Sequence, residues 1–248
     1  MSTAGLSAFT AWSPLRPVAR APRTADRSRD ALASGSAPAG AARSGGELHT
    51  VALEDELVEQ ARELAARLLA TVDDDGRRWR HTQAVAERAA EGAAAVAPEQ
   101  VNLLLAAAWL HDVGYAPALV QTGFHPVDGA LHLQRSLWPP ALVGLVAHHS
   151  GARLVAGVRQ LGHLLDPFSR PGYWSGPVAD ALTWADQTTA PDGRRVTVHE
   201  RIAEVLERHG PTSAQVRCHA QRGPLLIGAV RATEDRLLLA RAARTSAG

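Results

Sequence analysis

The sequence predicts an all-α protein, and three observations support this class. Apolar residues recur mostly every three or four positions through much of residues 51–245, whereas the strict alternation typical of β-strands is scarce. Proline and glycine separate these periodic segments, as in Trp138-Pro139-Pro140 and Gly210-Pro211. With 248 residues, the chain is also long enough to bury a substantial core. We therefore expect one helical bundle over residues 51–245.

The first three helices are predicted by their periodicity and by the residues at their ends. Leucines and alanines spaced by three and four positions begin near residue 51, and this helix should end at the turn signal 73–76. A second helix should cover about 78–96. Pro98 then begins a third helix, which should end near Gly114.

Five shorter helices are expected in the second half of the chain. Their predicted ranges are 126–137, 140–149, 177–187, 198–209 and 223–244. The segment 163–177, rich in Pro, Gly, Ser and aromatic residues, should be the longest loop. Apolar residues at helical spacing within 198–244 predict that these C-terminal helices pack on the rest of the domain or form the surface of a homodimer.

Residues 1–48 differ in composition from the rest of the chain. Ala, Pro, Arg, Ser and Gly recur there without a period, as in the segment 33–40. Such a segment cannot bury enough apolar surface to offset the entropy of ordering it, so we predict a disordered tail. An overextended start or an Arg-rich targeting peptide is an alternative, although no amphipathic period supports the latter.

The charge and cysteine content exclude several kinds of partner and scaffold. The formal net charge is +1, and all 26 basic residues are arginine, so neither sign of charge dominates to attract nucleic acid or an anionic membrane. No uninterrupted apolar stretch reaches the length of a membrane span. The single cysteine, Cys218, rules out a disulfide framework. We therefore expect a cytoplasmic protein.

Histidine and aspartate side chains recur at the ends of the predicted helices. These candidate ligands are His81, His111, Asp112, His125, His148, His149 and Asp186. Imidazole nitrogens and carboxylate oxygens bind divalent metals, and a cluster drawn from several helices can hold two ions. Asp112 has two oxygens and could bridge such a pair, so it is the central candidate for catalysis. The pattern predicts a metal-dependent hydrolase.

Each candidate taken alone has an ordinary explanation. A single histidine is more often a surface or hydrogen-bonded core side chain than a ligand. Asp186 follows the apolar stretch 181–185, where an arginine partner or a capping role would equally compensate its burial. The prediction therefore depends on the order and number of these residues.

That order resembles the HD superfamily of metal-dependent phosphohydrolases. The segment 80–86, which contains His81, looks like the first motif, Leu110-His111-Asp112-Val113-Gly114 the second, and Thr183-Trp184-Ala185-Asp186 the last. The resemblance covers about residues 75–190. It implies an HD-domain helical bundle with the metal site in this core and the helices of 198–244 packed around it.

Two further histidine motifs resemble those of dinuclear members of the superfamily. They are Gly123-Phe124-His125-Pro126-Val127-Asp128-Gly129-Ala130 and Val146-Ala147-His148-His149-Ser150-Gly151. The resemblance implies one ion held by His81, His111, Asp112 and Asp186. It implies a second ion held by Asp112, His125 and His148. Fe, Mn, Co and Mg all remain open as the metals, and His149 would add a ligand or contact substrate.

Among dinuclear members, the run from His125 to Ala130 is similar to that of bacterial diadenosine tetraphosphate hydrolases. Other branches fit less well. Tyr115 stands where nucleoside monophosphatases have an acidic residue, the Glu-Asp of alarmone hydrolases is absent, and no Gly-Tyr-Pro of cyclic dinucleotide phosphodiesterases follows His149.

The resemblance implies hydrolysis of a phosphoester or phosphoanhydride in a small phosphorylated molecule such as a nucleotide. Arginine binds phosphate through two parallel hydrogen bonds, so we predict that Arg80 and Arg153, with His149, contact the substrate. Two alternatives stay open. The same ligands occur in HD-fold di-iron oxygenases that act on small organic substrates, and the metal could also serve a non-catalytic module.

Overall fold

Helices make up nearly all regular structure in the computed structural model, which describes residues 45–170 and 174–246, with side chains from residue 56 onward. Within these residues there is no β-strand, apart from one isolated bridge between Thr189 and Arg195. The helices are α1 (Gly45–Leu69), α2 (Arg77–Glu91), α3 (Val101–Leu110), α4 (His125–Arg135), α5 (Pro140–His148), α6 (Ala152–Val158), α7 (Pro177–Gln187), α8 (Val198–His209), α9 (Ala214–Arg217) and α10 (His219–Ser246). The all-α prediction is confirmed.

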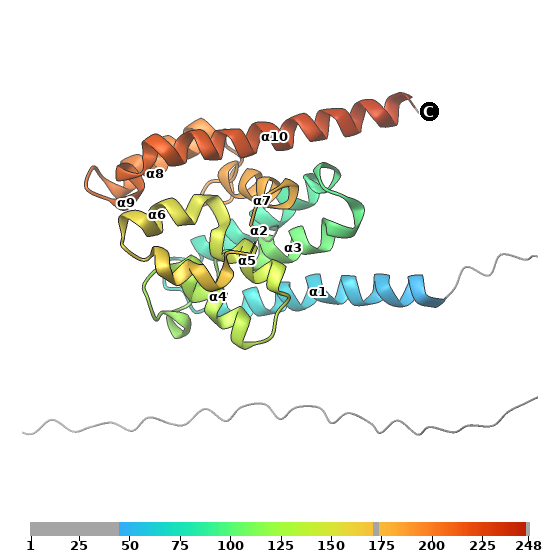
Figure 1. Ribbon diagram of the computed structural model, residues 1–248, viewed down its shortest axis with the longest axis horizontal. Coiled ribbons are helices and arrows are strands. Elements are labelled where there is room, and N and C mark those ends of the chain that lie inside the picture. The colour runs from blue at the N-terminus through green and yellow to red at the C-terminus, as the bar shows by residue number, and fades with distance from the viewer. Residues whose placement is uncertain (1–44, 171–173, 247–248) are drawn as a thin grey trace, which may run out of the picture. The chain divides into compact units, whose positions relative to one another are not determined.

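The core is built around α3, which is apolar on every side. Its buried residues include Leu104 and Leu110, and it packs against α1, α2, α5 and α7. A helix without a polar face is most stable when other helices surround it, because all its apolar side chains are then removed from water. Figure 1 shows the resulting order within the domain, with α1 on one side of α3 and with α7, followed by α10, on the other.

Helix starts follow local signals in the sequence. Pro140 and Pro177 occupy the first positions of α5 and α7, where proline's missing N–H costs no hydrogen bond. Helix α8 begins with a capping box. The backbone N–H of Glu200 donates to the Thr197 hydroxyl oxygen, and the backbone N–H of Thr197 donates to the Glu200 carboxylate. These signals place the predicted starts of α5, α7 and α8 correctly.

Other elements differ from the prediction. Helix α1 begins at Gly45, inside the segment 1–48 predicted as a tail, while residues 1–44 lie outside the described part of the chain. The short helices α6 and α9 were not predicted, and a 3-10 helix, η6 (Gly162–Phe168), occupies the first part of the predicted loop 163–177. Elements this short show too few turns for a periodicity to indicate them.

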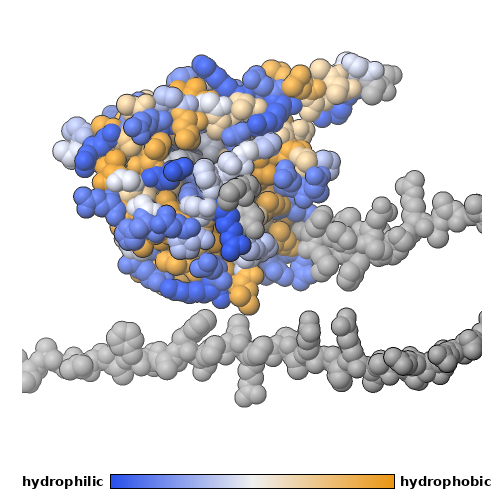
Figure 2. All heavy atoms as spheres, in the orientation of Figure 1, coloured by the Kyte–Doolittle hydropathy of each residue, from blue (hydrophilic) through white to orange (hydrophobic). Residues whose placement is uncertain are grey.

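One segment has the length and composition of a membrane span. It covers Pro140–Val158, and 72% of its most apolar window is buried within the domain. Its apolar side chains, among them Leu142 and Val146, belong to the core. On the face seen in Figure 2, hydrophilic and hydrophobic residues are interspersed over the folded domain.

Candidate metal centre

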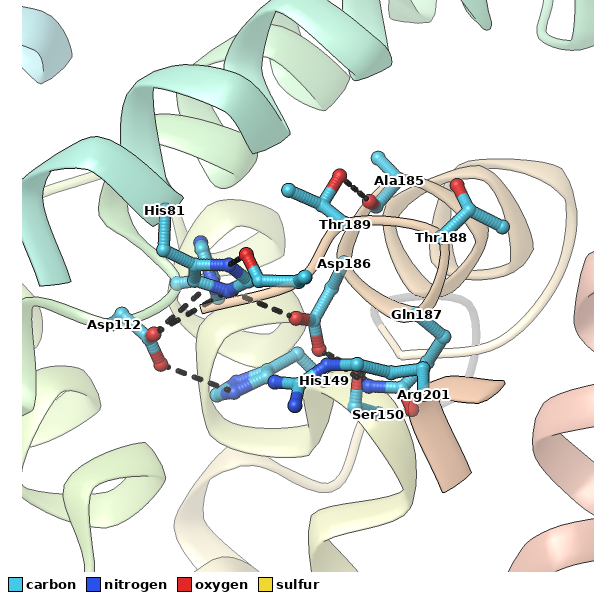
Figure 3. A network of polar contacts seen from close by, with 12 residues as sticks. His81, Asp112, His149, Ser150, Ala185, Asp186, Gln187, Thr188, Thr189 and Arg201 are labelled. Carbon is cyan, nitrogen blue, oxygen red and sulfur yellow. Dashed lines mark hydrogen bonds and ion pairs between the residues drawn. The ribbon is translucent and has the colours of Figure 1, made fainter. Parts of the chain in front are cut away.

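Three helix ends meet at the candidate metal centre. His81 lies near the start of α2, His111 and Asp112 directly follow α3, and Asp186 lies in the last turn of α7. The three helices contact one another, and the rings of His81 and His111 are 5.6 Å apart between centroids. Because the start of α2 meets the end of α3, the two helices form the antiparallel pair that a shared site requires. Figure 3 shows His81, Asp112 and Asp186 converging.

The first group of candidate ligands consists of His81, His111 and Asp112, all fully or almost fully buried. One nitrogen or oxygen of each lies within 4.8 Å of the others. Asp186 joins this group through His81, since its Oδ1 is 3.1 Å from His81 Nε2. The structure therefore brings together all four residues expected around one ion.

The second group consists of Asp112, His125 and His149. His125 Nε2 lies 3.3 Å from Asp112 Oδ1 and 3.3 Å from His149 Nε2. His149 Nε2 is 3.8 Å from the same aspartate oxygen. Asp112 thus stands between the two groups, with Oδ2 towards His81 and His111 and Oδ1 towards His125 and His149.

The structure places His149 in this second group, and not His148, which the motif had led us to expect there. The side chain of His148 lies outside this group. Its Nε2 is 3.1 Å from Ser169 Oγ, and its ring packs against Trp174. The two residues differ in direction because α5 ends at His148 and the backbone kinks there. Ser150, within the 3-10 turn η5 (His149–Gly151), has a φ of 49°, which is rare for a residue with a side chain.

Three of the histidines are oriented by the same device. Nδ1 of His81 lies 3.0 Å from the carbonyl of Ala190, and Nδ1 of His111 and His149 lies 2.7 Å from a carbonyl three residues earlier in the chain. A carbonyl can only accept, so each Nδ1 carries the proton. Nε2 of each ring is therefore directed into the centre, as in histidines that bind metal.

Asp186 is held in place by two residues, Ser150 and Gln187, to which the sequence analysis assigned no role. Ser150 Oγ and Gln187 Nε2 both donate to Asp186 Oδ2, the latter at 2.8 Å, which leaves Oδ1 towards His81 (Figure 3). The backbone carbonyl of Ser150 accepts in turn from Arg222 Nε at 3.0 Å. The kinked segment after α5 therefore supplies both His149, which lies near Asp112, and Ser150, which orients Asp186.

Gly114 permits the close approach that brings His125 to Asp112. A Cβ atom at Gly114 would lie 2.0 Å from the carbonyl oxygen of His125 and 2.6 Å from the amide nitrogen of Gly129. No side chain fits in that space. Gly114 of the second motif and Gly129 of the third are thus explained by the contact between the turn after α3 and the start of α4.

Charge around Asp112 keeps it ionised. Burial opposes ionisation, but Arg78 and His111 hold the pKa of Asp112 well below its usual range. Arg78 Nη1 lies 2.5 Å from Asp112 Oδ2, and its guanidinium lies 3.9 Å from the centre of the Tyr115 ring. The Tyr115 ring stacks on His125 at 4.0 Å. Tyr115 thus aligns a candidate ligand and an arginine.

The donor set fits divalent metal ions. Nε2 of His111 is buried without a hydrogen-bond partner among the described residues. With neutral rings, His81 Nε2 and Asp186 Oδ1 would direct lone pairs at each other across 3.1 Å, which is unfavourable unless a cation or a proton lies between them. Buried imidazole and carboxylate groups arranged in this way are the ligands of borderline and hard divalent metals.

The arginines expected to contact substrate lie elsewhere. Arg80 Nη1 donates to the carbonyl of Asp75 on the exposed side of α2. Arg153 lies over the ring of Trp174, beside His148. Neither lines the cavity of about 620 Å³ at the metal centre. The arginines that do are Arg78, Arg201, Arg208 and Arg222.

Sequence reasoning missed Arg201, Arg208 and Arg222 because the C-terminal helices were expected only to pack on the domain or to form a dimer surface. Val198, Ile202 and Val205 are indeed buried at helical spacing. The interleaved arginines of α8 could have been noticed as a second, polar face directed at the domain. Arginine is so abundant in this chain that no single position stood out.

The helical bundle and its buried histidine–aspartate centre define a domain of the metal-binding hydrolase type. The family model described as HD domain matches residues 78–209, and the chain belongs to this family. Its members are mostly metal-dependent phosphohydrolases, which implies that this chain binds a divalent metal. No curated protein and no solved structure matches the chain in the corresponding comparisons.

Proposed function

We propose that this protein hydrolyses a phosphate ester or phosphoanhydride bond in a small phosphorylated molecule such as a nucleotide, using two divalent ions. One observation carries the proposal: two groups of candidate ligands share Asp112, which lines a cavity together with four arginines. Membership of the HD family supports the hydrolytic chemistry.

The residues would divide between the two ions as the structure groups them. His81, His111, Asp112 and Asp186 would hold one ion, and Asp112, His125 and His149 the other. When bound, such ions lower the pKa of a water molecule and polarise the phosphoryl oxygens. Asp112 has a carboxylate oxygen towards each group, so it is the residue on which both ions would depend.

The chain's own contribution is orientation and charge. Backbone carbonyls hold the protons of three histidines on Nδ1, and Ser150 and Gln187 fix the direction of Asp186. Arg78 places a planar cation at the edge of the centre, where it can donate two hydrogen bonds to a phosphoryl group. Because these groups are already in place, little reorganisation is needed when substrate binds.

Metal analysis followed by activity screening tests this function. The protein, purified without oxygen, is analysed for metals and then assayed with p-nitrophenyl phosphate, bis(p-nitrophenyl) phosphate and nucleotides in the presence of Mn, Fe, Co or Mg. We expect phosphate or nucleotide release that requires metal and is lost in Asp112→Ala and His81→Ala. Arg80→Gln serves as the control for surface substitution, because Arg80 faces away from the cavity.

The same preparation distinguishes the oxygenase alternative. An HD-fold di-iron oxygenase would consume oxygen with an organic substrate and would release no phosphate from any compound in the screen. Oxygen uptake, measured with an electrode on the iron-loaded protein, together with an absence of phosphate release, would overturn the hydrolase proposal.

A further inference from the structure

Three arginines of the C-terminal helices line the same cavity as the metal centre. Arg201 and Arg208 extend from α8 and Arg222 from α10. They come from a part of the chain that supplies none of the candidate metal ligands. The cavity therefore has a second charged wall, formed by elements far in sequence from α2 and α3.

These arginines have fewer anionic partners than their charge requires. Arg201 and Arg208 both pair with one carboxylate, Glu204, the latter at 3.4 Å. Arg201 is 7% exposed, and its Nε has no hydrogen-bond partner among the described residues. Two of the three guanidinium groups thus share one glutamate and the third, that of Arg222, has no carboxylate partner, so the three arginines carry two more positive charges than their ion pairs neutralise.

Arg222 is the clearest case. Its Nε donates to the carbonyl of Ser150 at 3.0 Å, and no carboxylate of the described residues lies within ion-pair distance of it. Burial lowers the pKa of Arg222, because nothing nearby fully replaces the water around its charge. Arg222 is half-buried, so its charge has lost part of its hydration without gaining a carboxylate partner, and an anion bound in the cavity would offset this cost.

The position of Arg222 links this wall to the metal centre. Ser150, whose carbonyl it holds, donates its hydroxyl hydrogen to Asp186, which contacts His81. Arg78 lines the same cavity beside Asp112. An elongated anion could therefore have one end at the metal ligands and the other at the arginines of α8 and α10.

We propose that Arg201, Arg208 and Arg222 bind a second phosphate group of the substrate, one that is not cleaved. The substrate class is then a compound with at least two phosphate groups, rather than a monophosphate. This inference rests on the proposed function for the identity of the first phosphate. The excess charge of the arginine wall matches the charge of one additional phosphate at neutral pH.

Binding to the metal-free protein tests the arginine wall without relying on catalysis. The full chain, treated with EDTA, is titrated calorimetrically with inorganic pyrophosphate and, separately, with orthophosphate. We expect pyrophosphate to bind with 1:1 stoichiometry and at least about 10-fold more tightly than orthophosphate, since charge-assisted hydrogen bonds to a second phosphate contribute that much. Equal affinity for the two anions would overturn the proposal.

Variants show which arginines are responsible. Arg222→Gln and Arg208→Gln should each weaken pyrophosphate binding about 10-fold. Arg217→Gln is the matched control, because Arg217 is exposed on α9 and does not line the cavity. Circular dichroism establishes that each variant is folded. If Arg217→Gln weakens binding as much as Arg222→Gln, the effect is one of general charge and the proposal is wrong.

The two proposals fail separately. Pyrophosphate binding that depends on Arg222, in a protein without phosphohydrolase activity, would retain the anion site and remove the proposed function. Metal-dependent hydrolysis of monoesters, combined with no preference for pyrophosphate, would retain the function and overturn the second phosphate site.

Discussion

Two adjacent histidines at the end of α5 serve different regions of the molecule. His149 is buried, directs Nε2 towards Asp112 and lines the metal cavity together with charged side chains. His148 lies outside the metal cavity and lines a second cavity, of about 850 Å³, whose lining is largely apolar and includes Trp174 and Leu225; His149 borders this cavity as well, but its Nε2 is directed to the metal centre. Successive residues on a helix project about 100° apart, and the kink at Ser150 adds to this difference. A His-His motif therefore does not by itself identify the ligand.

Removing Asp112 should have the largest effect on the metal side. Asp112→Ala removes the carboxylate shared by both ligand groups, so we expect metal affinity to fall by more than about 100-fold, beyond what outer residues of a metal site contribute. Calorimetric titration with Mn measures this loss. Retention of two bound ions in the variant would show that Asp112 is not the shared ligand.

The two histidines can be compared directly. His149→Ala should weaken binding of the second ion by about 10- to 100-fold, whereas His148→Ala should change metal affinity by less than about 3-fold. The expected difference follows from geometry, because only His149 lies near Asp112 and His125. The measurement is metal stoichiometry and affinity in both variants. Equal losses would falsify the assignment of the two residues to separate regions.

Two glycines, one beside the metal centre and one at the second cavity, allow the stability of the two regions to be compared. Gly114→Ala should lower the free energy of unfolding by about 3 kcal/mol, since a Cβ atom there meets the backbone of α4. Gly228 lines the second cavity on α10, and a Cβ atom there meets nothing within 4 Å. Gly228→Ala should therefore raise stability by about 0.5 to 1 kcal/mol through helix propensity.

Urea denaturation of the metal-free protein measures both glycine variants. Metal is removed first, because ions bound only to the folded state would add their own stabilisation. A Gly114→Ala protein as stable as the unmodified chain would mean that the turn after α3 can move away from α4. Metal affinity would then report whether His125 moves with it.

The smallest expected effect separates two neighbouring arginines. If the proposed function holds, Arg78→Gln should lower kcat/KM about 10-fold, because Arg78 adjoins Asp112 in the cavity. Arg80→Gln should change kcat/KM by no more than about 2-fold, since Arg80 holds the exposed turn before α2. Steady-state kinetics on one phosphorylated substrate checks both. A larger effect of Arg80→Gln would mean that Arg80 contacts the substrate after all.

Much of the fold could be predicted because its signals are local. Proline at the first position of α5 and α7, and the capping box of α8, act through their own backbone neighbours. Because α3 is apolar on all sides, a central position could be expected for it without knowing how the other helices are arranged. Elements without such signals, like α6 and α9, depend on what they pack against, and the sequence did not indicate them.

In the candidate site, too, some residues are indicated by local sequence signals and others are not. His81, the His111-Asp112 pair, His125 and Asp186 could be predicted, because each lies where a recognisable helix begins or ends. The choice of His149 over His148 depends on a backbone kink with a positive φ at a serine. No sequence rule predicts such a conformation, since it persists only where surrounding contacts hold it.

The sequence by itself determined the helical class, the HD family and most of the candidate ligands, because residue type and spacing along one helix are properties of the chain alone. Only the tertiary structure decided that Asp112 stands between two ligand groups, that Ser150 and Gln187 orient Asp186, and that arginines of α8 and α10 face the cavity. Several of these contacts join residues far apart in the sequence, such as Ser150 and Asp186, which are 36 positions apart. Their geometry follows from how the helices pack against one another, and packing is settled by the whole core rather than by any one segment.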